Sequence, residues 1–159
     1  MRLDIIEAEV FTRSDNIALD IFTVIDADRR SIPIQAQLQE MTFLLEGALS
    51  EPPRFASIWA CSRHKFLAPP PHFRPEIVID NACSEGSTVV QVNATNRLGL
   101  LYDILETIAE NGFNVIQARI ATPDSCAHDT IHITDADGHK VGGASRLEEL
   151  QRRLEAALT

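Results

Sequence analysis

Cysteine is scarce in this sequence, and Cys61, Cys83 and Cys126 lie far apart with no C-x-x-C pair. This spacing predicts neither a disulfide framework nor a zinc knuckle, and it is typical of a protein of the reducing cytosol. Basic residues are also few, 14 against 23 acidic ones, so the formal net charge is −9. With that charge and only 6% aromatic residues, the chain is a poor partner for nucleic acid.

Long apolar runs are missing as well. No stretch reaches the length of about eighteen uninterrupted apolar residues that a membrane-spanning helix needs. Asp4 and Glu7 stand where a secretory signal would carry apolar residues. We therefore expect a cytoplasmic protein with no membrane partner.

The chain has 159 residues, of which 45% are hydrophobic. This is enough to build one ordinary domain or two small ones. Alternating residues at 5–12 and 19–25 predict two strands joined by a hairpin. A helix is predicted to follow Ser31 and Pro33, with an apolar stripe at helical spacing formed by Ile34, Leu38, Met41, Leu45 and Leu49. Residues 51–75 are rich in proline and predict a linker, whose apolar segment 55–60 packs on a neighbouring part of the protein.

The second part of the chain predicts the order β-α-β-β-α. Strands are expected at 76–80, 87–93, 113–122 and 127–134. The first helix carries an apolar stripe and ends near Gly112; the stripe is Leu101, Ile104, Leu105 and Ile108. The last helix is expected to open at a capping box formed by Ser145 and Glu148.

An internal repeat relates the two parts. Ala8 matches Ala118 at an offset of 110, and Asp20 matches Asp129 at an offset of 109 after one residue is dropped in the hairpin. The helix stripes keep the same phase, with Leu45 on Leu154. The first copy lacks an opening strand and helix, which leaves a strand edge and an apolar face to be covered by another chain or by an upstream region. We therefore expect this chain to be the carboxyl-terminal piece of a longer protein.

Three segments carry a resemblance to a known family: 77–84, 92–104 and 118–122. They resemble the tandem carboxyl-terminal ACT domains of the bacterial protein-PII uridylyltransferase/uridylyl-removing enzyme family. The resemblance implies an α+β, ferredoxin-like fold, with an incomplete ACT unit at 1–50 and a complete ACT domain at 76–159. The family's loop usually reads Asp-Arg-Pro-Gly, whereas residues 96–99 here read Asn-Arg-Leu-Gly.

The function that the resemblance implies is regulatory. In this family the ACT pair senses glutamine and biases a nucleotidyltransferase and a phosphohydrolase that lie upstream. The present sequence shows no nucleotidyltransferase loop and no His-Asp pair at ligand spacing. We therefore expect no catalysis by this chain alone, no catalytic residue and no cofactor, and partners in the form of an amino acid, a second copy or the upstream domains.

The candidate ligand site lies where the 87–93 strand leads into its helix. A helix amino terminus offers free N–H groups and the positive end of the helix dipole to a ligand carboxylate. Asn96 is placed to accept from the ligand's ammonium or to read a side-chain amide, and Gly99 permits close approach. The start of the next strand is expected to close the pocket from a partner unit. The candidate ligand-binding residues are Asn96, Arg97, Leu98, Gly99, Leu100, Leu101, Asn114, Val115 and Ile116.

The residues leave several alternatives open. Asn96 can equally be an ordinary helix cap, and Gly99 can serve only to let the helix pack closely on the sheet. Arg97 can be a solvated side chain rather than an anchor for a ligand carboxylate. A ligand-free ACT module that only assembles chains fits the same sequence.

A metal site is the sharpest rival. It would use one strand face carrying Cys126, His128, Thr130 and His132, opposite a core-directed face with Ala127, Ile131 and Ile133. We interpret that face as polar surface with no metal, and Cys83 and Cys126 as inert thiols.

Overall fold

The computed structural model describes residues 3–13, 15, 17–26, 31–32, 34–51, 53, 74–123 and 126–158. The predicted linker therefore lies almost entirely outside the described residues, as do Trp59, Cys61, His64 and His72. In the described part, every predicted strand and helix is confirmed to within a few residues. The elements are β1 Leu3–Thr12, β2 Ala18–Asp26, α1 Gln35–Ser50, β3 Glu76–Asp80, β4 Thr88–Thr95, α3 Leu100–Glu110, β5 Asn114–Ala121, β6 Cys126–Thr134 and α4 Ala144–Leu158.

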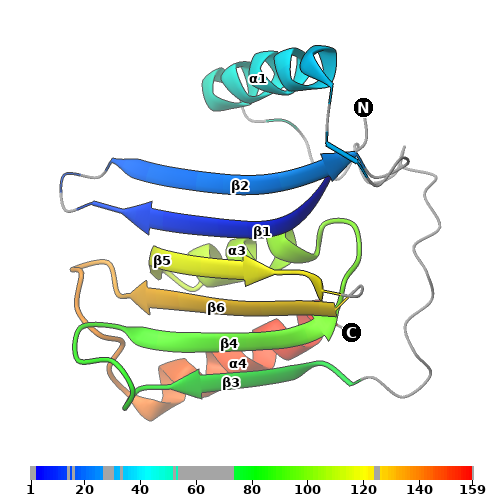
Figure 1. The fold of residues 1–159 in the computed structure, drawn as a ribbon. Helices are drawn as coiled ribbons and strands as arrows, with labels where there is room; N and C mark the ends of the chain where they lie inside the picture. The colour runs from blue at the N-terminus through cyan, green and yellow to red at the C-terminus, as the bar shows by residue number, and fades with distance from the viewer. Residues whose placement is uncertain are drawn as a thin grey trace.

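One antiparallel sheet of six strands runs through both parts of the chain, in the order β2-β1-β5-β6-β4-β3. Figure 1 shows α3 and α4 behind this sheet, with its other face free of helices. The expected α+β fold is thus confirmed. None of the helices in the described part of the chain is long and apolar enough to cross a membrane.

The core belongs mainly to the second half of the chain, residues 76–159. Alternating residues of β4 and β6 face the apolar stripes of α3 and α4, because strand and helix periods bring one face of each inward. The largest fully buried apolar side chains are Val90, Val92, Ile104, Ile108, Ile131, Ile133, Val141, Leu150 and Leu154. From the first half, residues 1–50, Ala8 of β1 joins this core.

The two halves meet where β1 pairs with β5, and this seam has pseudo-two-fold symmetry. Ala8 lies opposite Ile120, and Val10 lies opposite Ala118. When each residue of one pair is replaced by its counterpart in the repeat, that pair becomes the other pair. The register shifts of both strands also coincide in the repeat, at Ile6 in β1 and at the matching residue of β5.

The two carboxyl-terminal helices of the repeat differ sharply in burial. In α4, Leu154 is 0% exposed, whereas the matching Leu45 of α1 is 52% exposed. No residue of α1 is buried. Figure 1 shows α1 beyond the β2 edge of the sheet. In the predicted apolar stripe of α1, Leu38 and Met41 are half-buried. Ile34, Leu45 and Leu49 are exposed.

The start of α4 differs from the sequence prediction. The helix begins at Ala144, so Ser145 lies within its first turn rather than at its cap. Gly143 precedes the helix with a φ of 86°, and its carbonyl accepts from the Arg146 amide at 3.2 Å. Glycine adopts a left-handed conformation at little cost, so the helix begins directly after Gly143, two residues before the start that a cap at Ser145 predicts.

Candidate functional site at the seam between the two halves

The loop from β4 into α3 is shaped by Gly99. This residue is the amino-terminal cap of α3, with φ 80° and ψ 0°, and the helix has no side-chain cap. The alternative in which Asn96 caps the helix is not realised, because the chain turns at a left-handed glycine instead. The amide of Leu100 donates to the Arg97 carbonyl at 3.1 Å. The Leu101 amide lies in the first turn, where helix geometry itself provides no acceptor.

Arg97 fastens this loop to the end of α4. Its Nη2 donates to the Ala157 carbonyl at 2.7 Å and lies 2.6 Å from Oδ2 of Asp103. A guanidinium at the last carbonyls of a helix also interacts favourably with the helix dipole. Arg97 is therefore not simply a solvated side chain, because it ties the loop to α4. Its Nη2 group contacts protein acceptors rather than a ligand carboxylate.

The two predicted parts of the site lie at opposite ends of the sheet. β4 and β5 are both antiparallel to β6, so they run parallel to each other. β4 ends with Thr95 opposite Cys126, and β5 begins with Asn114 opposite Thr134. Asn114, Val115 and Ile116 therefore stand away from loop 96–99 of the same half, and the Asn114 side chain donates to the Asp135 carbonyl at 3.3 Å.

The segment that shares an end of the sheet with loop 96–99 is the start of β1. Because β1 is antiparallel to β5, its first residues lie where β5 ends, and the Ile6 carbonyl accepts from the Thr122 amide at 3.1 Å. The repeat offset relates residues 4–6 to 114–116. Asp4, Ile5 and Ile6, which sequence reasoning did not single out, therefore lie at the same end of the sheet as loop 96–99.

An apolar cavity of about 250 Å³ opens on the helix side of the seam. Two of the predicted site residues line it, Leu101 from α3 and Val115 from β5. Among the lining residues the ionisable one is Asp20 of β2. The full lining is Ala8, Val10, Asp20, Phe22, Leu101, Leu105, Val115, Ala118 and Ile120. The arrangement combines a helix amino terminus, a carboxylate and an apolar chamber between two structural units.

Asp129 is a buried acid that sequence reasoning missed. It is 3% exposed on the same face of β6 as Ala127 and Ile131. Its Oδ1 has no hydrogen-bond partner within the part of the chain that the structure describes. Burial raises the pKa of this carboxyl to about 7, and a hydrogen bond from the Ala121 backbone offsets only part of that effect. The repeat was the available signal, since Asp129 matches Asp20.

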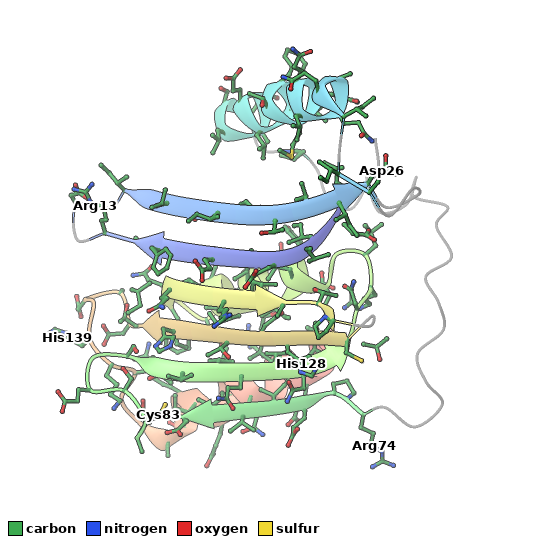
Figure 2. The ribbon with its side chains drawn as sticks, in the orientation of Figure 1. Arg13, Asp26, Arg74, Cys83, His128 and His139 are labelled. Carbon is green, nitrogen blue, oxygen red and sulfur yellow. The ribbon has the colours of Figure 1, made fainter. Side chains whose placement is uncertain are left out.

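The polar face proposed as an alternative metal site is held by hydrogen bonds to β4 and the loop before it. Nδ1 of His128 lies 2.8 Å from Oδ1 of Asn93, and Nδ1 of His132 lies 3.0 Å from the Ser87 hydroxyl. Figure 2 shows His128 and His139 at opposite ends of the sheet.

Among the described residues, the side chains that could converge on an ion are instead Asp135, Asp137 and His139, which lie in one exposed turn. Oδ1 of Asp135 accepts from the backbone amides of the other two at 3.1 and 2.8 Å. That pattern is an ordinary turn supported by an aspartate side chain.

Comparison with known families decides the assignment. A family profile described as "ACR9-like, ACT-like domain" matches residues 76–159, which is more than half of the chain. The chain belongs to the ACT-like domain family. The resemblance seen in the sequence is thereby confirmed, and so is its ferredoxin-like fold.

The similar proteins are much longer than this ACT chain. The bifunctional uridylyltransferase/uridylyl-removing enzyme of Gluconobacter oxydans is 34% identical over 161 residues, which cover 98% of this chain and 17% of the relative. The enzymes of the same name from Azospirillum brasilense and Rhodospirillum rubrum are 31% and 26% identical, again over 17% of their lengths. The chain therefore corresponds to a small, ACT-like part of these proteins. We found no solved structure that matches it significantly.

Proposed function

We propose that this chain is a regulatory module that binds an amino acid, with glutamine as the ligand, at the seam between its two halves. The chain carries out no catalysis in this proposal. It acts in a longer or multi-chain protein-PII uridylyltransferase-like system, whose catalytic domains lie outside the 159 residues. Binding shifts the arrangement of the halves, and the size of that shift is limited by the difference in affinity between the two arrangements.

The observation that carries the proposal is the juxtaposition of the α3 amino terminus with the apolar cavity at the seam. First-turn amides can donate to a ligand carboxylate, and Leu101 lies in that same turn and lines the cavity. Asn96 supplies a side-chain amide for the ligand's ammonium or its own amide. Glutamine matches this set because it has a carboxylate, an ammonium, an amide and a short aliphatic stem.

The site is expected to have mixed walls. Loop 96–101 comes from the second half, and residues 4–6 at the start of β1 come from the first. Val115 lines the cavity together with Leu101, whereas Asn114 lies at the far end of the sheet, where its side chain donates to the Asp135 carbonyl. We therefore expect one glutamine per chain of 159 residues.

Isothermal titration of the whole chain with glutamine, glutamate, serine and 2-oxoglutarate tests the proposal, with the mass in solution measured on the same sample. We expect saturable heat with glutamine alone. Asn96→Ala and Gly99→Asp should abolish that heat while circular dichroism shows a folded protein. Asn93→Ala is the matched control, since this residue lies on the helix-free face beside His128, and it should titrate like the original chain.

A ligand-free assembly module is the second candidate, and the engagement of Arg97 favours it. The loop's one cation already has protein partners in Ala157 and Asp103. If this reading holds, none of the four compounds gives heat. Asn96→Ala and Gly99→Asp then leave the solution mass unchanged. That result would rule out the sensor in the isolated chain.

A further inference from the structure

Asp129 brings a carboxyl group into the part of the core that adjoins the candidate site. Its side chain is 3% exposed, and on the helix side of the sheet it lies opposite Val92 of β4 and Ile120 of β5. Ile120 lines the seam cavity together with Leu101. Side chains directly opposite each other on two strands have Cβ atoms about 5 Å apart. The acid therefore stands directly behind the cavity wall.

The hydrogen bonding of this carboxyl group places it near the end of the sheet that holds loop 96–99. It accepts from the backbone of Ala121, the last residue of β5. Its Oδ1 has no hydrogen-bond partner in the part of the chain that the structure describes. A buried charge with so few donors around it is poorly screened, so it interacts strongly with any charge that a ligand places nearby.

The strands on either side of Asp129 present no ionisable side chain to it within the described residues. The residues of β4 and β5 on the same face near this position are Val92, Ala94, Ala118 and Ile120. The ionisable side chains nearby on β5 and β6, those of Arg119, His128 and His132, belong to the helix-free face by strand alternation. In the sheet the carboxyl group is therefore surrounded by apolar side chains.

The helices likewise bring no compensating charge to the Asp129 carboxyl group in the described part of the chain. The buried side chains of α3 and α4 are all apolar. The first acid of α3, Asp103, lies 2.6 Å from Arg97, and Glu106 accepts from the Tyr102 hydroxyl. No ionic partner contributes to the pKa of Asp129, which is governed by burial. A ligand at the seam would thus meet a negative charge that the protein has left unneutralised.

We propose, on the basis of the amino-acid binding proposed above, that Asp129 is a specificity-determining residue of the seam site, which admits glutamine and excludes glutamate. The two compounds share an α-carboxylate, an ammonium and an aliphatic stem. They differ in the side chain, which ends in a neutral amide in glutamine and in a carboxylate in glutamate. Beside the cavity, that second carboxylate is repelled by the buried acid, whereas the amide is not.

The exclusion of glutamate depends on the ionisation of Asp129. Burial raises the pKa of this acid to about 7, so it is about nine-tenths ionised at pH 8 and about one-tenth ionised at pH 6. Glutamate enters beside the acid when the acid holds a proton, and this requirement weakens its binding by about tenfold at pH 8. Glutamine carries no such requirement. The ratio of the two affinities should therefore rise about tenfold from pH 6 to pH 8.

The test measures this ratio by calorimetric titration of the whole chain with glutamine and by displacement of bound glutamine with glutamate. In Asp129→Asn the ratio should rise about tenfold less between pH 6 and pH 8, because asparagine does not titrate. Comparing the two proteins removes any pH effect that the ligands themselves contribute. Asp129→Ser, whose side chain is smaller, repeats the comparison if the asparagine variant does not fold.

Glu9→Gln is the matched control, because it removes the same charge from the helix-free face, where Glu9 lies opposite Arg119. It should show the same rise in the affinity ratio as the original chain. If it abolishes the rise as fully as Asp129→Asn does, the net charge of the chain explains the selectivity and the role of Asp129 is overturned.

The remaining outcomes separate this role from amino-acid binding itself. If the folded original chain binds no glutamine at either pH, amino-acid binding at the seam is overturned and the role of Asp129 falls with it. If glutamine binds but the affinity ratio changes equally in the original chain and in Asp129→Asn, the role of Asp129 alone is overturned. The same conclusion follows if glutamate displaces no glutamine from Asp129→Asn at pH 8.

Discussion

Gly99 shows how much depends on a single backbone conformation. Its φ of 80° is open to glycine and strained for residues with a Cβ. We predict that Gly99→Ala lowers the free energy of unfolding by about 1 to 2 kcal/mol, measured by urea denaturation. Gly47→Ala is the matched control, because this glycine is exposed inside α1 with no atom near an added Cβ. It should raise stability by up to about 1 kcal/mol, and equal effects of the two changes would contradict the argument.

Asp129 predicts a pH dependence. Its pKa is raised from an ordinary value of 3.8 to about 7 by burial. The folded chain then holds this proton more tightly than the unfolded chain does. Its contribution to stability is present below about pH 4 and is lost as the pH rises to about 7, by a free energy on the order of 4 kcal/mol.

The measurement is urea unfolding at pH 5 and pH 8 for the original chain and for Asp129→Asn. The original chain should lose more stability between the two pH values than the variant does, because asparagine does not titrate. Histidine titration is common to both proteins and cancels in the comparison. An identical loss in both proteins would show that Asp129 does not change protonation in this range.

Individual residues were the hardest part of the site to predict from sequence. Asn96 has the chemistry of a cap, yet the chain caps α3 at Gly99, since a left-handed glycine closes the turn without a side-chain acceptor. Arg97 reaches Ala157, a contact that no local pattern encodes. Asp129 could have been placed on the core face by alternation, because it stands between Ala127 and Ile131.

At the scale of the elements, the two helices of the repeat should respond differently to the same truncation. Leu154→Ala removes a fully buried side chain from α4 and should cost about 2 to 5 kcal/mol of unfolding free energy. Leu45→Ala removes its exposed counterpart from α1 and should cost less than about 0.5 kcal/mol. Chemical denaturation of both variants checks this, and similar losses would mean that α1 is covered in solution.

The tie between loop 96–99 and α4 gives a second prediction for elements. Arg97→Ala removes a donor to Ala157 and an ion pair with Asp103, so we expect a loss of about 1 kcal/mol. Hydrogen exchange should become faster in the last turn of α4. Arg13→Ala is the control, because its ion pair with Asp15 is exposed and should contribute little. Unchanged exchange at the end of α4 would argue against the tie.

Elements were predictable because their signals are local. Alternation located β1, β2 and β6, and the spacing of Leu101, Ile104 and Ile108 located α3. The start of α4 was missed by two residues, because the capping box at Ser145 is a local helix-start signal, whereas the left-handed turn at Gly143 decides where the helix begins.

For the whole molecule, the sequence repeat predicted two copies of one unit but not the sheet that joins them. The β1-β5 pairing depends on two strands far apart in the chain. Both strands carry matched irregularities, at Ile6 where β1 pairs with β2 and at Ile116 where β5 pairs with β6. Neither feature has a local signature. The position of residues 4–6 at the same end of the sheet as loop 96–99 depends on this pairing.

Stability should be distributed unevenly over the molecule. The second half holds nearly all the buried apolar side chains, so β4 and β6 should show the slowest amide exchange, and β2 and α1 the fastest among the described elements. Hydrogen exchange with mass spectrometry on the native chain checks this order. Equal protection of β2 and β6 would contradict it.

The β1-β5 seam also bears on the order in which the chain acquires its structure. Glu7 and Arg119, whose side chains form an ion pair across this seam, are 112 positions apart. Closing so long a loop costs more chain entropy than any hairpin here, so contacts of this kind form late. During synthesis the first half leaves the ribosome early. The edge of β1 that later pairs with β5 stays unpaired, and the β1-β2 hairpin stays exposed to other strands, until the second half has emerged.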